Sequence, residues 1–95
     1  MQYNNVGTLY LVSTPIGNLD DLTFRSLKVL NQADLILAED TRVSSVLLNF
    51  YDISKRVENY HLKNEHYKTS RIIEKLKTGI TIAMISDAGT PAVSD

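Results

Sequence analysis

Polar and glycine-containing clusters follow each of four short apolar runs in this sequence of 95 residues. The clusters cover residues 13–20, 39–42, 61–65 and 86–91, and their side chains include carboxylates, hydroxyls, amides and an imidazole. If the apolar runs are parallel strands, the clusters meet at the carboxyl edge of one sheet, where open α/β sheets bind ligands. The pattern therefore predicts one composite site. Polar loops and helix caps explain the same residues structurally, and the pattern leaves both explanations open.

The second cluster begins with two adjacent carboxylates, Glu39 and Asp40, directly after an apolar run. Removing a carboxylate from water costs free energy unless the group is ion-paired, hydrogen-bonded or used in a reaction. Arg42 offers an ion-pair partner, which at a surface contributes at most about 1 kcal/mol. We therefore consider Glu39 and Asp40 as catalytic acid–base groups, with a capped helix start beside a surface ion pair as the alternative.

The last cluster is the strongest local indication of a ligand-binding site. It consists of Ser86, Asp87, Ala88, Gly89, Thr90 and Pro91. Small residues at the end of a strand let a ligand lie close to the backbone. The side chains of Ser86, Asp87 and Thr90 can hydrogen-bond to hydroxyl or amino groups of that ligand. The alternative is a polar turn that Pro91 closes.

The first cluster contains Pro15, Gly17 and Asn18 but no phosphate-binding pattern, neither Gly-x-Gly-x-x-Gly nor Gly-Lys-Ser/Thr. Gly17 would let a ligand approach the backbone closely, although a plain turn explains it as well. In the third cluster, His61 lies five residues before the second histidine, His66, so the two fall on different helix faces. Because no third ligand lies nearby, we predict no metal site.

The spacing of apolar runs and turn formers predicts strands that alternate with helices. We expect strands at residues 8–13, 34–38, 56–60 and 80–85, with one helix in each of the three intervals. Such alternation favours a parallel sheet with right-handed crossovers. The prediction is an α/β fold with a mostly parallel sheet of about four strands and helices on its faces. The continuous apolarity of residues 8–13 predicts a strand buried on both faces.

Each expected helix has a capping residue and an apolar side. Asp20 and Asp21 are expected to open the first helix, Thr41 to cap the second and Asn64 to cap the third, and Gly79 is expected in the left-handed conformation after it. The apolar sides are expected to be Leu22, Phe24, Leu27, Val29 and Leu30 in the first helix, Val43, Val46, Leu47 and Phe50 in the second, and Ile72, Ile73 and Leu76 in the third.

Composition excludes several classes of protein. Ten basic and eleven acidic residues give a net charge of −1, which provides no global attraction to nucleic acid. A basic stripe of Lys68, Arg71 and Lys75, joined by Lys77, could contact phosphates, although a solvated helix face explains it as well. The absence of cysteine excludes disulfides and permits a reducing cytosol. No apolar run approaches the roughly 20 residues that span a bilayer, so no membrane association is expected.

Four motifs in order resemble the N-terminal part of the small-subunit ribosomal RNA methyltransferases, within the tetrapyrrole (corrin/porphyrin) methylase superfamily. They are Ser-Thr-Pro-Ile-Gly-Asn-Leu-Asp at 13–20, Ala-Glu-Asp-Thr-Arg at 38–42, His-x-x-Asn-Glu at 61–65 and Ser-Asp-Ala-Gly-Thr-Pro at 86–91. The resemblance runs from about Thr8 to Asp95. The first loop separates this group from the tetrapyrrole enzymes, whose loop usually reads Gly-x-Gly-Pro-Gly-Asp.

The resemblance implies a cytoplasmic enzyme that uses S-adenosylmethionine to methylate a cytidine 2′-oxygen in small-subunit (16S) ribosomal RNA. It implies a cofactor cleft between two α/β domains, so residues 1–95 are expected to be a truncated N-terminal domain, inactive without its C-terminal domain. Within it, Glu39 and Asp40 become the catalytic candidates. The cofactor-binding candidates are Pro15, Gly17, Ser86, Asp87, Ala88, Gly89, Thr90 and Pro91, and the substrate-binding candidates are Asn18, Arg42, His61 and Asn64.

Two other functions stay open at this point: a methyltransferase that acts on a tetrapyrrole precursor, and a nucleotide- or RNA-binding module without catalysis. A tetrapyrrole methyltransferase would belong to the same superfamily, but the unusual loop after the first strand disfavours this function. The second depends on the polar clusters and the basic stripe. Because a truncated α/β domain exposes surface that once packed on its neighbour, we also expect self-association, as in a homodimer.

Overall fold

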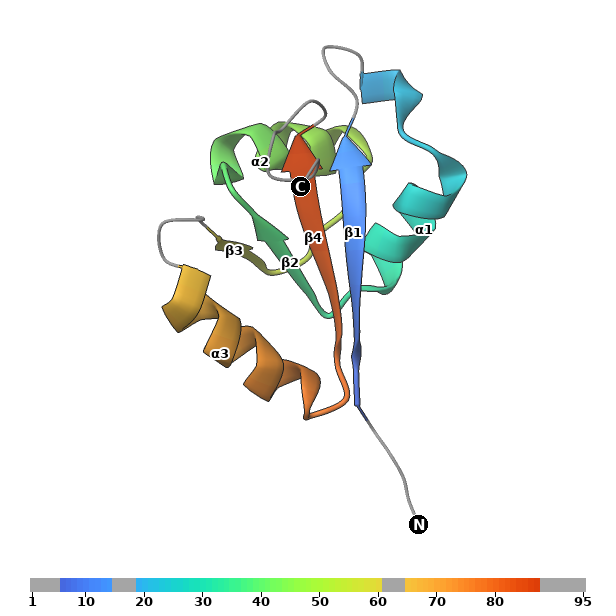
Figure 1. The fold of residues 1–95 in the computed structure, drawn as a ribbon. Coiled ribbons are helices and arrows are strands. Elements are labelled where there is room, and N and C mark those ends of the chain that lie inside the picture. Colours follow the sequence, from blue (N-terminus) through green and yellow to red (C-terminus); the bar gives the residue numbers. More distant parts are fainter. Residues whose placement is uncertain (1–5, 15–18, 61–64, 88–95) are drawn as a thin grey trace.

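Strands and helices alternate along the part of the chain that the computed structural model describes, residues 6–14, 19–60 and 65–87 (Figure 1). The elements are β1 (Thr8–Thr14), α1 (Phe24–Gln32), β2 (Leu35–Ala38), α2 (Thr41–Phe50), β3 (Val57–Asn59), α3 (Glu65–Leu76) and β4 (Thr81–Asp87), with a 3₁₀ turn at Leu19–Asp21. None of the described helices is long and apolar enough to cross a membrane.

The four described strands form one sheet in the order β1-β4-β2-β3, and every pairing is parallel. The last strand, β4, therefore lies between β1 and β2, which are the first two strands along the chain. Tyr10 pairs with Ala83, and Ala83 pairs in turn with Ile36, so three strands align across the sheet. The predicted α/β fold with a parallel sheet of four strands is confirmed.

Two layers of helix cover the sheet. Side chains alternate between the two faces of β2, so the hydrophobic core consists of two clusters. Ile36 packs with Leu30 of α1 and Leu48 of α2 on one face. Leu37 packs with Ile72 of α3 on the other face. Figure 1 shows α3 on the opposite side of the sheet from α1 and α2. All four residues of β2 are buried because this inner strand is covered on both faces.

β1 differs from the predicted strand buried on both faces. Its Val12 and Thr14 are buried, but Leu9 and Leu11 are 40% and 68% exposed. The reason is its position at the margin of the sheet, where α1 packs on one face and no described element covers the other. The expectation for residues 8–13 is therefore wrong, since the sequence of a strand does not reveal its place in the sheet, and the strand that is buried on both faces is β2.

The first helix begins later than expected. Asp20 and Asp21 lie in the 3₁₀ turn, and the N-cap of α1 is Thr23, whose hydroxyl oxygen accepts a hydrogen bond from the Ser26 N–H at 3.0 Å. Phe24 is 92% exposed instead of part of the apolar side. At about 100° per residue it lies roughly 120° around the helix from the fully buried Leu30.

The second helix is capped one residue earlier than predicted and buries a different face. Asp40 is the N-cap and Thr41 is the first helical residue. The core side consists of Ser44, Leu47 and Leu48, which follow helical spacing. Of the predicted apolar side only Leu47 is buried, and the exposed members are Val43, Val46 and Phe50. Ser44 is the polar member of this buried side, with 3% of its surface exposed.

The third helix agrees with its prediction in part. Ile72 is buried and Leu76 is half-buried against the same cluster, whereas Ile73 is exposed. Gly79 has φ of 93° and donates its N–H to the Leu76 carbonyl at 2.9 Å, which confirms the left-handed cap. The predicted cap Asn64 lies outside the described residues, as does the side chain of Lys68.

Gly7 allows the start of β1 to lie against the turn before β4. Its N–H donates to the Leu76 carbonyl at 2.7 Å, and a Cβ at this position would lie 1.8 Å from the Ile80 carbonyl oxygen. That oxygen belongs to the backbone and accepts the Thr8 N–H at 3.2 Å, so it cannot move without breaking the first bond between β1 and β4.

Gly7→Ala is expected to lower the free energy of unfolding by about 1–3 kcal/mol, as overpacking a tight site does. The measurement is urea denaturation followed by circular dichroism. Val6→Ala at the neighbouring exposed position is the control, and we expect it to change the free energy by no more than about 0.5 kcal/mol. Equal stability of the two variants would contradict the close approach at Gly7.

Candidate functional site

The carboxyl ends of the strands meet at one edge of the sheet, which we call the rim. Thr14 at the end of β1 pairs with Asp87 at the end of β4, and Ala38 at the end of β2 pairs with both Ile85 and Asn59. The predicted convergence of the strand ends is therefore confirmed. The described rim residues are those that end the strands or directly follow them.

Many of the predicted site residues lie outside the described part of the chain, so their roles remain predictions. This group consists of Pro15, Gly17, Asn18, His61, Asn64, Ala88, Gly89, Thr90 and Pro91. Asp87 is described as the last residue of β4, without its side chain. Glu39, Asp40, Arg42 and Ser86 are described in full, and they form the part of the site whose geometry is known.

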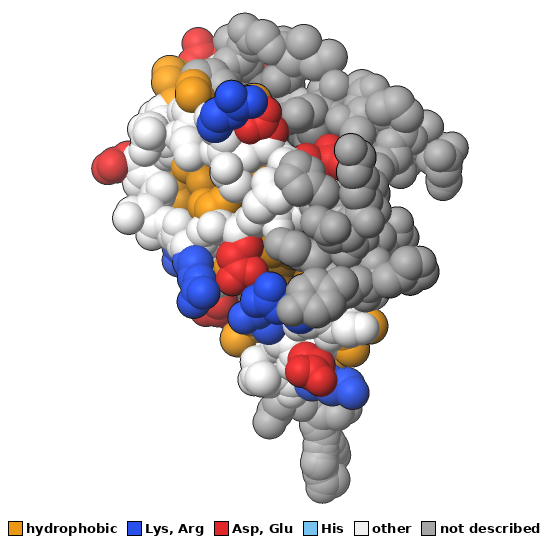
Figure 2. Space-filling view, turned by 90° about the vertical axis from the view of Figure 1, so that its left-hand side faces the viewer, with side chains coloured by type: hydrophobic (Ala, Val, Ile, Leu, Met, Phe, Trp, Pro, Cys, Tyr) orange, Lys and Arg blue, Asp and Glu red, His pale blue; other side chains and the backbone are white. Residues whose placement is uncertain are grey.

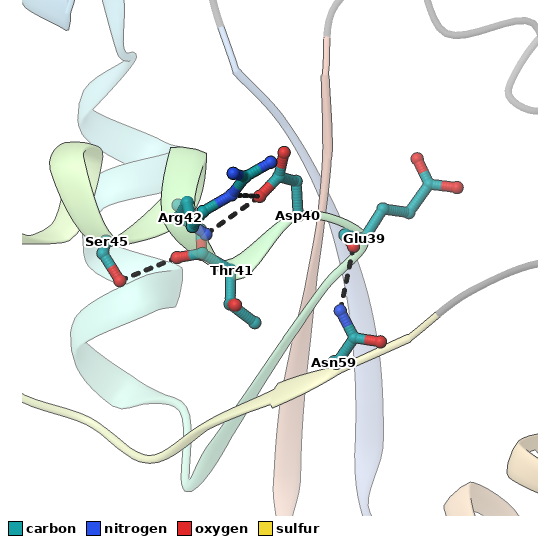
Figure 3. A network of polar contacts seen from close by, with 7 residues as sticks. Glu39, Asp40, Thr41, Arg42, Ser45 and Asn59 are labelled. Atoms are coloured by element: carbon teal, nitrogen blue, oxygen red, sulfur yellow. Dashed lines mark hydrogen bonds and ion pairs between the residues drawn. The ribbon is translucent and has the colours of Figure 1, made fainter.

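Asp40 caps helix α2. Its extended backbone turns the side chain back onto the helix, where Oδ1 accepts the Arg42 N–H at 3.0 Å and lies 3.5 Å from Arg42 Nε (Figure 3). These interactions, the backbone hydrogen bond first and the guanidinium second, lower the pKa of the Asp40 carboxyl below its usual value of 3.8. Asp40 is thus an ionised cap whose basicity is reduced.

The Glu39 carboxylate makes fewer described interactions than the Asp40 carboxylate. Figure 3 shows its side chain directed away from Asp40, Arg42 and α2. Within the described residues its carboxylate makes no hydrogen bond or ion pair, although the residue is half-buried at the end of β2. A carboxylate at the carboxyl edge of a parallel sheet, where open α/β sheets bind ligands, can accept a proton or a hydrogen bond from a bound molecule.

The backbone of Glu39 is held from the neighbouring strand. Asn59 donates from Nδ2 to the Glu39 carbonyl at 3.0 Å, and the Tyr60 N–H donates to the Ala38 carbonyl at 2.8 Å (Figure 3). The bond from Asn59 links the ends of β2 and β3, so it fixes the backbone from which the Glu39 carboxylate projects. Sequence reasoning missed Asn59 because its partner lies 20 residues away.

Ser86 and Thr14 form the other described part of the rim. The buried Thr14 hydroxyl donates to the Ser86 carbonyl at 3.3 Å, and Ser86 itself is half-buried. The bond joins the ends of β1 and β4. Thr14 belongs to the first predicted cluster, but the sequence indicated no role for it, because a threonine at the end of an apolar run is typical of any strand.

Arg42 presents a cation at the rim. Its side chain is 91% exposed, and only its Nε approaches the Asp40 carboxylate among the described contacts. The remaining guanidinium N–H groups are suited to anionic oxygens such as those of phosphate. Among the described residues there is no group of three or more His, Cys, Asp or Glu side chains that could hold a metal ion. The rim therefore offers hydroxyl, carboxylate and guanidinium groups for hydrogen bonding and proton transfer.

The lowered pKa of Asp40 predicts a pH dependence. Because the folded-state pKa lies below the unfolded value, the cap stabilises the folded state above about pH 3.9, and this contribution is lost as the pH falls through the folded pKa. NMR titration of the side-chain carboxyl carbons is expected to give Asp40 a pKa below 3.8. Asp40→Asn retains a capping side chain, so its stability relative to the unsubstituted chain should improve on acidification. A measured pKa at or above 3.8 would contradict the capping geometry.

Comparison with known proteins identifies the family. The sequence model of the family described as Tetrapyrrole (Corrin/Porphyrin) Methylases matches residues 8–95. The resemblance expected from the four motifs is thereby confirmed at the level of the superfamily, and so is the fold class.

Curated relatives match almost the whole chain, and they carry the name "Ribosomal RNA small subunit methyltransferase I". The protein of Halalkalibacterium halodurans is 52% identical over 94 residues, which are 99% of this chain and 32% of the relative. Those of Haemophilus influenzae and Bacillus subtilis are 55% and 48% identical, over 94% and 97% of this chain and 31% and 32% of the relatives. The chain spans about a third of the length of these relatives. With nearly all of its residues matched by the family model, this chain belongs to the tetrapyrrole (corrin/porphyrin) methylases.

Proposed function

We propose that this chain supplies part of the active site of a cytoplasmic methyltransferase that transfers a methyl group from S-adenosylmethionine to a cytidine 2′-oxygen in small-subunit (16S) ribosomal RNA. The observation that carries the proposal is the sequence identity to proteins named as small-subunit ribosomal RNA methyltransferases. It is 48–55% over 94–99% of the chain. The specific nucleotide chemistry follows from the motif resemblance described above.

The described rim is chemically compatible with S-adenosylmethionine. That ligand carries hydroxyl and amino groups but no phosphate, and the rim combines the Ser86 hydroxyl and the Glu39 carboxylate with a sequence that has no phosphate-binding loop. When bound, it supplies an electrophilic methyl group on a positively charged sulfur. Ser86 and Asp87, with the following residues 88–91 and with Pro15 and Gly17, would hold it.

Glu39 would accept the proton of the ribose hydroxyl. In the transfer, the bond between sulfur and the methyl carbon breaks as the bond between the 2′-oxygen and that carbon forms, and the hydroxyl proton must leave. Glu39 is better suited to take this proton than Asp40, because its carboxylate is directed away from α2 and makes no hydrogen bond or ion pair within the described residues, whereas Asp40 caps α2 with a lowered pKa. Asp40 would act as a positioning residue that anchors the start of α2.

Arg42 would contact the RNA. Its exposed guanidinium fits a phosphate oxygen of the ribosomal RNA backbone, with Asn18, His61 and Asn64 as further substrate contacts. Because the chain spans only a third of its relatives, the remaining cofactor and substrate contacts would come from the rest of such a protein. We therefore expect no methyl transfer by the 95-residue chain alone.

The test is a chimera in which this chain replaces the matched segment of the Halalkalibacterium halodurans relative. Incubated with small ribosomal subunits and labelled S-adenosylmethionine, the chimera is expected to form 2′-O-methylcytidine, detected by mass spectrometry of nuclease-digested RNA. Glu39→Gln should lower kcat by about 100-fold or more, as expected for loss of a general base. The change in KM should be small by comparison.

Asp40→Asn is the matched control, since it also neutralises a carboxylate at the rim but preserves the cap. It is expected to retain most of the activity of the chimera. Equal loss of kcat in both variants would contradict the separate roles of the two carboxylates. A methyl group on a base would overturn the proposed reaction, and so would methylation of a tetrapyrrole precursor in place of RNA.

A further inference from the structure

Charged side chains gather where β3 lies beside α3. Glu58 of β3 pairs with Leu37 in the sheet, so its side chain lies on the face that carries α3. The two carboxylate oxygens of Glu58 have separate partners, because Oε2 lies 3.4 Å from Arg56 Nη2 and Oε1 lies 3.8 Å from Arg71 Nη2. One carboxylate therefore holds two guanidinium groups that come from different elements of the fold.

The two arginines retain most of their hydrogen-bonding capacity. Each approaches Glu58 through one Nη atom, at a distance typical of an ion pair rather than of a short hydrogen bond. The side chains of Arg56 and Arg71 are 74% and 44% exposed. A guanidinium group has five N–H donors, in a planar arrangement that fits the oxygens of a phosphate. Since two positive charges face one negative charge, the group can accommodate a further anion.

Lys75 adds a third cation, one helical turn after Arg71. It is half-buried, and it forms no ion pair with a carboxylate of the described residues. A depression of about 290 Å³ is lined by Arg71, Glu74, Lys75 and Thr78. An ammonium group that is partly removed from water is stabilised by a nearby negative charge. We refer to Arg56, Arg71 and Lys75 as the cation cluster.

The stability of the fold does not account for the cation cluster. Ion pairs between exposed side chains contribute little to folding, and the two pairs of Glu58 are long and lie at the surface. Figure 2 shows basic and acidic side chains next to one another on the side of the molecule where Figure 1 places β3 and α3. Because the Glu58 side chain is only 20% exposed, it orients the two guanidinium groups and leaves them accessible to a ligand.

We propose that the cation cluster binds phosphate groups of a single-stranded RNA backbone and so extends the rim as an RNA-binding surface. The choice of RNA as the polyanion rests on the proposed function. Arg56 lies three residues before Asn59, about 10 Å along the strand, and Asn59 binds the Glu39 carbonyl at the rim. An RNA strand that passes the rim can therefore continue along the outside of β3 toward α3. Such contacts position a strand without reading its sequence.

The test is an NMR titration of the isotope-labelled 95-residue chain with a short oligouridylate, a method that detects the weak binding expected at a net charge of −1. The side-chain signals of Arg56 and Arg71 are expected to shift. Arg71→Gln should raise the dissociation constant about fivefold, as expected for loss of one phosphate contact. It should also reduce the slope of log affinity against log salt concentration by about 0.7.

Arg25→Gln is the matched control, since it makes the same substitution at an exposed position of α1, on the opposite side of the sheet. It should leave the dissociation constant unchanged, and equal weakening by both variants would overturn the proposed location. Glu58→Gln removes a negative charge but also the group that holds the arginines, so it is expected to weaken binding. Tighter binding by Glu58→Gln would overturn an ordered site in favour of general attraction.

The ligand itself is tested with two further probes. An oligonucleotide with an uncharged methylphosphonate backbone is expected not to bind, and binding equal to that of RNA would overturn recognition of phosphate. Tighter binding of polyglutamate than of RNA would assign the cluster to an acidic protein segment instead. None of these measurements needs methyl transfer. Methylation by the chimera without RNA binding at the cluster would therefore overturn this inference alone, whereas RNA binding without methylation would contradict the proposed reaction alone.

Discussion

The insertion of β4 between β1 and β2 is the constraint on which the rest of the structure depends. Parallel hydrogen bonding on both of its sides fixes where Thr14, Ala38 and Asp87 end relative to one another, so the rim exists only when β4 is in place. The start of β4 is held as well, because Asp34 donates its N–H to the Thr81 carbonyl and accepts the Thr81 N–H at its carboxylate, both at 2.8 Å. The strand that completes the rim is thus the last described element of the chain.

The rim shows how two neighbouring carboxylates acquire different chemistry from local backbone geometry. Asp40 turns onto the first N–H groups of α2, whose positive end stabilises its charge and lowers its pKa. Glu39, one residue earlier, still belongs to the end of β2, and Asn59 binds its carbonyl so that the side chain projects from the sheet edge. The transition from strand to helix between the two residues therefore separates a carboxylate that caps a helix from one that makes no hydrogen bond or ion pair within the described residues.

Features of the fold that depend on local sequence patterns could be predicted. Features that depend on contacts between distant segments could not. The strands, their parallel order along one edge and the Gly79 cap follow from apolar runs and turn residues. The buried side of α2 does not, because Val43, Val46 and Phe50 form an apolar stripe as regular as the one that packs. The hydrogen bond from Asn59 to the Glu39 carbonyl and the exposure of one face of β1 both depend on the sheet order, which no single segment encodes. Sequence reasoning therefore found both carboxylates but could not divide their roles.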